Sequence, residues 1–216
     1  MYFKVDGALA MTRDELLQDL AYARTIAEEG RHAPLLGGSY LLFWGVLNAV
    51  AFIAHWAARS GYLSTLGDGA FAAVWMSYGV LAGIGMAVLR SRVRDKPGLT
   101  TIGARAERAV WSGAGIALMA VVIGSIARMI FTQDQTAPNA IFGAAFAIYG
   151  AALYATAMMS EQGWLKRFAW LSAGVALTLC LFANAPWAYL YAALGSLLVL
   201  GWPGLILMKR EPSAIV

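Results

Sequence analysis

Acidic residues are absent from every long apolar stretch of this sequence. Only 13% of the 216 residues are charged, whereas 60% are hydrophobic. Soluble domains carry about 25% charged residues, so the composition indicates a chain surrounded by lipid. Cation-coupled carriers and intramembrane aspartyl enzymes generally place a carboxylate at membrane depth. The missing carboxylates therefore argue against both classes.

Cysteine and histidine are also scarce. The single cysteine, Cys180, excludes an intrachain disulfide and a cysteine-based metal site. The two histidines, His32 and His55, do not form a His-Glu-x-x-His zinc motif or a pair of axial haem ligands. No glycine-rich phosphate loop is present either. We therefore predict no catalytic residue, no metal and no cofactor.

Long apolar stretches alternate with short charged connections, which predicts an all-α polytopic membrane protein with six transmembrane helices. Each stretch can cross about 30 Å of hydrocarbon as a helix, and the fifth is the shortest. Pro203 lies inside the sixth stretch and is expected to kink it. The predicted spans are residues 35–57, 69–89, 109–131, 138–160, 167–184 and 186–208.

Lys and Arg are distributed unequally between the connections. Of the 16, all but Arg59 and Arg128 lie in the N-terminal segment, the even-numbered connections or the C-terminal tail. Because positive charge concentrates on the cytoplasmic side, we expect both termini to lie in the cytoplasm. This bias also accounts for the basic net charge, so no nucleic-acid partner is expected. The polar first 34 residues predict an uncleaved signal anchor in the first span.

The chain thus divides into a cytoplasmic segment (1–34), a transmembrane domain (35–208) and a cytoplasmic tail (209–216). In the first segment, Thr12 and the glutamate three residues later form a capping box, which predicts an amphipathic helix over residues 13–29 that ends at Gly30. This segment is acidic, whereas helices that lie on membranes are usually basic. We therefore expect the helix to pack on the basic second connection or on a partner protein.

The second connection begins with a cluster of positive charge. Such a cluster marks the cytoplasmic end of a span and attracts anionic lipid. A dedicated surface for a cytoplasmic protein partner is the alternative, and a second copy of the chain is a further candidate partner. The cluster comprises Arg90, Arg92, Arg94 and Lys96.

An aromatic pattern recurs in the even-numbered spans. Spacings of four and three place three large residues on one helix face, and the glycine that follows is expected to let a neighbouring helix approach. We infer three hairpins and an internal triplication; chance similarity among aromatic-rich spans is the alternative. Gly79 and Gly83 likewise predict close helix packing. The repeated sets are Phe71, Trp75, Tyr78 and Gly79; Phe142, Phe146, Tyr149 and Gly150; and Trp187, Tyr191, Leu194 and Gly195.

Polar residues within the spans define a candidate ligand cavity that opens outward. It would be lined by Asn48, His55, Tyr78, Arg128 and Tyr149 and would accept a small polar or anionic molecule. The alternative is structural. A buried amide needs a partner, so Asn48 is expected to bond to one of the two tyrosines.

Arg128 has a structural alternative of its own. It lies about one turn from the outer end of the third span, where an ion pair is the simplest arrangement. The expected partner is Asp134, Asp68 or a lipid phosphate.

Two segments resemble small uncharacterised six-helix bacterial inner-membrane proteins, often encoded near winged-helix regulators. The segments are residues 29–45 and the Glu-Arg-Ala-Val-Trp run that ends at Trp111. The resemblance implies a location in a bacterial inner membrane and a regulatory or sensory role, but no specific binding residue. We therefore expect a non-enzymatic membrane protein that signals through its cytoplasmic helix and basic connection. A small-solute transporter or channel, and a membrane enzyme or accessory subunit of a larger complex, are the alternatives.

Overall fold

The computed structural model describes residues 13–31, 35–94, 96, 99 and 101–210, and every regular element in these ranges is helical. The elements are α1 (Arg13–Arg31), α2 (Gly38–Arg59), η1 (Ser64–Gly69), α3 (Ala70–Val93), α4 (Ile102–Thr132), η2 (Ala137–Asn139), α5 (Ala140–Met159), α6 (Leu165–Leu181), α7 (Ala188–Ser196), the π-helical η3 (Leu197–Gly201) and α8 (Trp202–Arg210).

Five helical stretches in the described ranges are long and apolar enough to cross a membrane. They are Gly38–Arg59, Ala70–Val93, Gly103–Thr132, Ala137–Met159 and Ala188–Arg210. These stretches confirm the prediction of a helical bundle with membrane-spanning character. The fifth predicted span corresponds to α6, which has only 17 residues and is not among the five.

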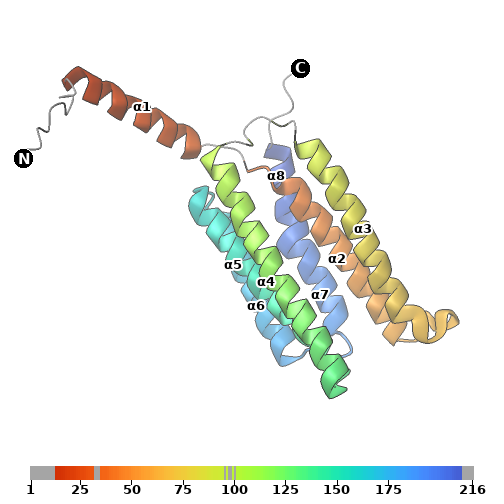
Figure 1. Cartoon of the computed structure of the whole chain (residues 1–216). Coiled ribbons are helices and arrows are strands. Elements are labelled where there is room, and N and C mark those ends of the chain that lie inside the picture. The colour runs from red at the N-terminus through yellow and green to blue at the C-terminus, as the bar shows by residue number, and fades with distance from the viewer. Residues whose placement is uncertain (1–12, 32–34, 95, 97–98, 100, 211–216) are drawn as a thin grey trace, which may run out of the picture.

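The helices form two groups that lie side by side (Figure 1). In the first group α2 packs against α3 on one side and against α7, η3 and α8 on the other. In the second group α5 packs against both α4 and α6. The rings of Phe52 and Phe142 connect the groups, with their centroids 5.1 Å apart. The core therefore lies around α2, α5, α6 and α7, and α3 and α4 flank it.

Glycine determines how closely α2 approaches the last membrane helix. A Cβ atom added at Gly45 would lie 2.7 Å from Cα of Gly201 and 3.0 Å from the carbonyl oxygen of Ser196. One added at Gly204 would lie 2.9 Å from the carbonyl oxygen of Gly38. The neighbours are backbone atoms, so only glycine permits this contact. Near Pro203, where a kink was predicted, a π-helical turn, η3, ends two residues before the proline.

Two predicted helix ends were wrong. Gly30 does not end α1, which continues to Arg31, since the strong helix formers beside it outweigh the cost of about 1 kcal/mol for one glycine. The third predicted span starts two turns too late, because α4 begins at Ile102. Its N-cap is Thr101, whose side chain accepts a hydrogen bond from the Ala104 amide at 3.3 Å. The predicted cap Thr12 and His32 lie outside the described residues.

The predicted packing at two glycines of α3 was also wrong. A Cβ atom at Gly79 or Gly83 would meet nothing within 4 Å among the described residues. Their counterparts in the aromatic pattern behave differently, because Gly150 approaches the Ala169 carbonyl of α6 and Gly195 approaches Phe146. The recurring pattern therefore does not correspond to recurring packing.

The helix α1 points away from the bundle (Figure 1), and its main contact is with α4. Most of α1 extends away from the described part of the basic connection, to which the first residues of α4 belong. Its apolar side chains are exposed, including Leu16 (48%) and Leu20 (66%).

Candidate functional site

A polar cluster around Asn48 links three helices in the middle of the bundle. The Tyr78 hydroxyl of α3 donates to Oδ1 of Asn48 at 2.7 Å, and Nδ2 of Asn48 donates to the Tyr149 hydroxyl of α5 at 3.4 Å. Asn48 is only 4% exposed. The expected partners are therefore confirmed, and the side-chain oxygen and one amide N–H are satisfied. We call these three residues the Asn48 cluster.

A second cluster surrounds His55, two turns further along α2. Nε1 of Trp75 donates to Nδ1 of His55 at 3.0 Å. The imidazole ring stacks on the Tyr189 ring, with centroids 4.1 Å apart and an interplanar angle of 13°. The Phe71 ring lies 4.9 Å away. We call this set the His55 cluster; the first two aromatic positions of the repeat in α3 thus hold the imidazole.

Tyr189 connects the His55 cluster to the loops at the same end of the bundle. Its hydroxyl donates to Oδ1 of Asn139 at 2.6 Å, and Nδ2 of Asn139 donates to Oδ1 of Asn184 at 2.7 Å. This chain joins η2 with the loop before α7. Neither asparagine was among the predicted site residues, although both lie beside connections on the same side of the predicted bundle.

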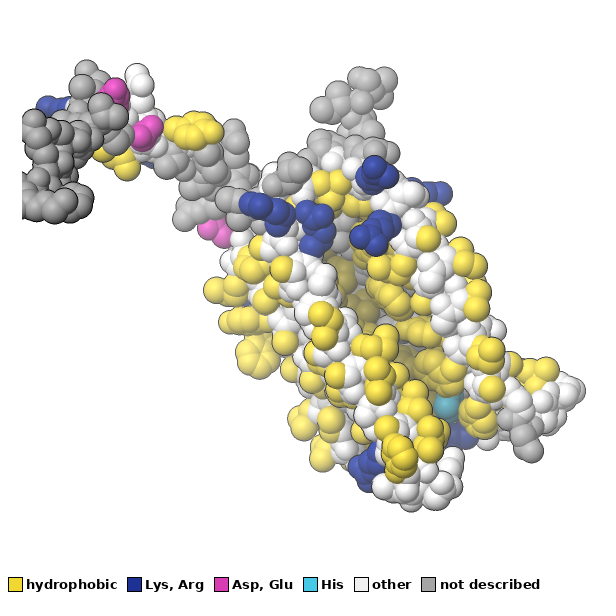
Figure 2. All heavy atoms as spheres, viewed as in Figure 1, with side chains coloured by type: hydrophobic (Ala, Val, Ile, Leu, Met, Phe, Trp, Pro, Cys, Tyr) yellow, Lys and Arg dark blue, Asp and Glu magenta, His cyan; other side chains and the backbone are white. Residues whose placement is uncertain are grey.

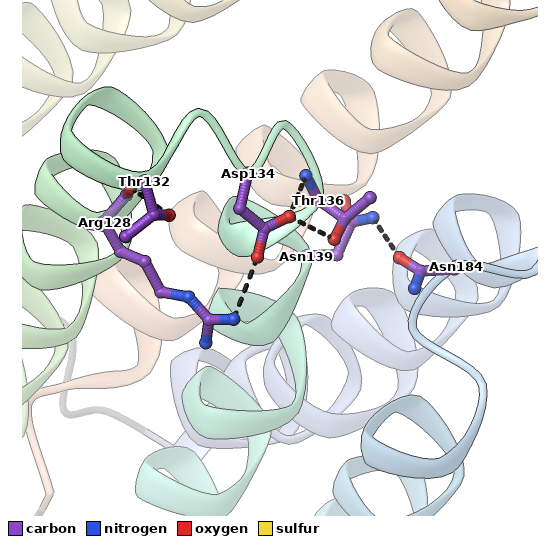
Figure 3. A network of polar contacts seen from close by, with 6 residues as sticks. All are labelled: Arg128, Thr132, Asp134, Thr136, Asn139 and Asn184. Carbon is purple, nitrogen blue, oxygen red and sulfur yellow. Dashed lines mark hydrogen bonds and ion pairs between the residues drawn. The ribbon is translucent and has the colours of Figure 1, made fainter.

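Arg128 lies in a third group, at the end of α4. Its guanidinium donates to Oδ2 of Asp134 at 2.9 Å across the α4–α5 turn (Figure 3). The Thr136 hydroxyl and backbone amide donate to Oδ1 at 2.7 and 3.0 Å. These Thr136 hydrogen bonds lower the pKa of the Asp134 carboxyl below its usual value, and Arg128 lowers it further. The expected ion pair with Asp134 is therefore confirmed.

The five residues proposed as one cavity thus lie in three places. Asn48, Tyr78 and Tyr149 form one cluster, His55 belongs to a second, and Arg128 pairs with a loop carboxylate. The first two clusters are connected through α2 and α3, because Trp75 and Tyr78 are in contact. The arrangement is that of interhelical connections, and in the His55 cluster the imidazole keeps a ring nitrogen, Nε2, that bonds to none of the described residues.

The opposite end of the bundle collects positive charge, as the dark blue side chains in Figure 2 show. Arg90 and Arg92 end α3, and both are exposed, as is Arg94, whereas Lys96 is half-buried. Arg108 holds the connection to α4 by donating to the Leu99 carbonyl at 2.7 Å. The exposed guanidinium groups at this end are therefore available to contact anionic groups outside the bundle.

A buried carboxylate, Glu107, lies beneath this basic end. It is 4% exposed, and its Oε2 accepts a hydrogen bond from the Leu36 amide at 3.2 Å. A Cβ atom at Gly37 would come within 2.5 Å of Oε1. Glu107 therefore holds the chain just before α2 against the first turns of α4. Glu107 was not among the predicted functional residues, although an acid between Arg105 and Arg108 was a visible signal.

These clusters can form hydrogen bonds to a ligand and hold the helices in position. The described residues contain no group of three or more His, Cys, Asp or Glu that could hold a metal ion. No protein-family model matches the chain, and neither a curated protein nor a solved structure matches it.

Proposed function

We propose that this chain is a non-enzymatic regulatory protein of a bacterial inner membrane, which binds a cytoplasmic protein through α1. The observation that carries the proposal is the position of α1. This helix projects from the bundle with Leu16, Leu17 and Leu20 exposed. An apolar stripe on a helix is the usual mark of a helix that binds in a groove of another protein.

The junction between α1 and α2 supports coupling between that partner and the membrane bundle. Glu107 connects α4 to the Leu36 amide, two residues before α2 begins. The α2 helix in turn carries both Asn48 and His55. A force on α1 would therefore act at the point where α2 and α4 are joined.

The proposal includes six membrane crossings: the five long apolar stretches and, in addition, α6. At 1.5 Å per residue, 17 helical residues extend about 26 Å, which a locally thinned bilayer accommodates. With six crossings both termini lie on the side of the basic cluster, which the positive-inside rule assigns to the cytoplasm. The three-hairpin repeat would then apply to the order of the helices along the chain but not to their packing, because the packing partners differ from hairpin to hairpin.

The orientation is tested by labelling with a membrane-impermeant maleimide in intact cells. Cysteines are introduced singly, in a background without Cys180, at Gly163 before α6 and at Asn184 after it. We expect Asn184→Cys to react from outside and Gly163→Cys to react only after permeabilisation. Equal reaction at both positions would mean that α6 does not cross.

The partner is tested by photocrosslinking in the host cell. A photoreactive residue at Leu16 or Leu20 should give one defined protein adduct, and Gln18, on the opposite face of α1, serves as the matched control. Adducts of equal yield at all three positions, or at none, would contradict the proposal. An adduct with a second copy of the chain would replace the cytoplasmic partner by a homo-oligomer.

A further inference from the structure

The imidazole of His55 is held in one orientation and one tautomer. The indole nitrogen of Trp75 can only donate, so Nδ1 of His55 accepts at 3.0 Å and carries no proton. The proton of the neutral ring is therefore on Nε2. Stacking on Tyr189 fixes the plane of the ring. The result is an N–H donor with a defined direction.

This donor is accessible from outside the protein. Nε2 of His55 has no hydrogen-bond partner among the described residues, and it is not one of their fully buried polar atoms. Figure 2 shows the histidine side chain in cyan at the lower end of a hollow between α4 and α3. An N–H donor in apolar surroundings is costly unless an acceptor binds to it.

The hollow has apolar walls. The helices α3 and α4 flank it (Figure 2), and each packs mainly against its own group rather than against the other. Both helices expose large apolar side chains, and the surface on either side of the hollow in Figure 2 is mostly hydrophobic. A hydrocarbon chain is the occupant that matches such walls.

A cation lies one helical turn beyond His55. Arg59 ends α2, and its guanidinium carbon is 5.9 Å from the centroid of the Tyr189 ring. Among the described side chains Arg59 contacts this ring rather than a carboxylate, whereas Arg128 at the same end is paired with Asp134. Arg59 is therefore the cation available to an anion at this end of the hollow.

We propose that this end of the hollow binds one phospholipid. Arg59 contacts the phosphate, Nε2–H of His55 donates to an ester carbonyl oxygen, and an acyl chain extends along the hollow between α3 and α4. One turn of helix, about 5.4 Å, separates the two contacts, and lipid ester groups lie just below the phosphate. The inference rests on the proposed membrane placement but not on a partner of α1.

The experiment is a titration of the delipidated full-length protein, followed by native mass spectrometry, with two phosphatidylglycerols. One has ester-linked chains and the other has ether-linked chains, which lack the carbonyl oxygens. The wild-type protein should bind the ester lipid about 2- to 10-fold more tightly than the ether lipid, because one net hydrogen bond changes the binding affinity by about this factor. In His55→Phe, which keeps a ring for stacking, this preference should disappear.

Arg59→Gln should weaken binding of both lipids about 5-fold, as expected for one interfacial cation. Arg128→Gln is the matched control and should leave binding within about 2-fold of wild type, because the ion pair with Asp134 already occupies Arg128. Arg59 is exposed, so this pair decides the phosphate contact even if His55→Phe fails to fold.

Three outcomes would overturn the proposal. Equal binding of ester and ether lipids by the wild type excludes the carbonyl contact. Equal weakening by Arg59→Gln and Arg128→Gln excludes the specific phosphate contact. A phosphorus-free adduct that co-purifies and is lost in His55→Phe assigns the site to another lipid-soluble molecule. None of these results bears on crosslinking at α1.

Discussion

Two regions of the molecule contain similar residues but pack very differently. One is the contact between α2 and the last membrane helix, and the other is the outer face of α3 and α4. Gly45 and Gly204 lie against backbone atoms, whereas Gly79 and Gly83 face open space among the described residues. Lipid tails are as apolar as leucine, so hydrophobicity does not drive one face inward and leave the other outside. What separates the two regions is whether another backbone fits against them.

The largest effect is expected from adding a methyl group at the close contact. Gly45→Ala places Cβ against the Gly201 backbone and should destabilise the bundle by about 3 kcal/mol. The matched control Gly79→Ala meets open space and should be neutral or stabilise its helix by up to about 1 kcal/mol. Unfolding of both variants in mixed micelles measures the difference, and equal stability would mean that the two regions are not distinct.

A smaller effect is expected at the one buried acid of α4. Glu107→Ala removes the acceptor for the Leu36 amide and should cost about 2 kcal/mol. Glu107→Gln keeps the shape and a neutral acceptor, so it should cost about half as much. Trypsin cleavage after Arg31 should accelerate in the same order. If the Ala variant is as resistant as wild type, Glu107 does not hold the α1–α2 junction.

The attachment of α3 to the core gives the next smaller effect. Tyr78→Phe removes the hydrogen bond to Asn48 and should cost about 1 kcal/mol, the usual size for an interhelical bond in a membrane. Tyr154→Phe, on the exposed face of α5, is the control and should change stability by less than about 0.5 kcal/mol. A similar loss in both variants would show that α3 does not depend on the Asn48 cluster.

The smallest effect concerns the half-buried carboxylate of Asp134. Its pKa is lowered in the folded protein, so its contribution to stability is present above the ordinary value of 3.8 and is lost as the pH falls through the lower folded value. The hydrogen bond from the Thr136 hydroxyl is the largest single cause, so Thr136→Val, which keeps the backbone bond, should raise the pKa of Asp134 more than Arg128→Gln, which removes only the charge and keeps a donor. Carboxyl titration by NMR tests the order, and the reverse order would make the ion pair dominant.

Some contacts of the candidate site could be predicted from the chemistry of individual residues. A buried amide needs partners, so Asn48 predicted Tyr78 or Tyr149, and both bond to it. The pair of Arg128 with Asp134 followed from their proximity in sequence. The contact of His55 with Trp75 and Tyr189 did not follow, because it joins three helices whose relative positions no local pattern encodes.

The sequence by itself determined the helices, because twenty or so apolar residues in lipid must satisfy their backbone hydrogen bonds within one helix. It also determined which connections are basic, since charge can be counted without coordinates. Only the tertiary structure decided which glycines are contacts and which face outward, where α1 points, and that Glu107 closes onto Leu36. Each of these depends on the close approach of segments far apart in the chain, and that approach is set by the shapes of two surfaces at once.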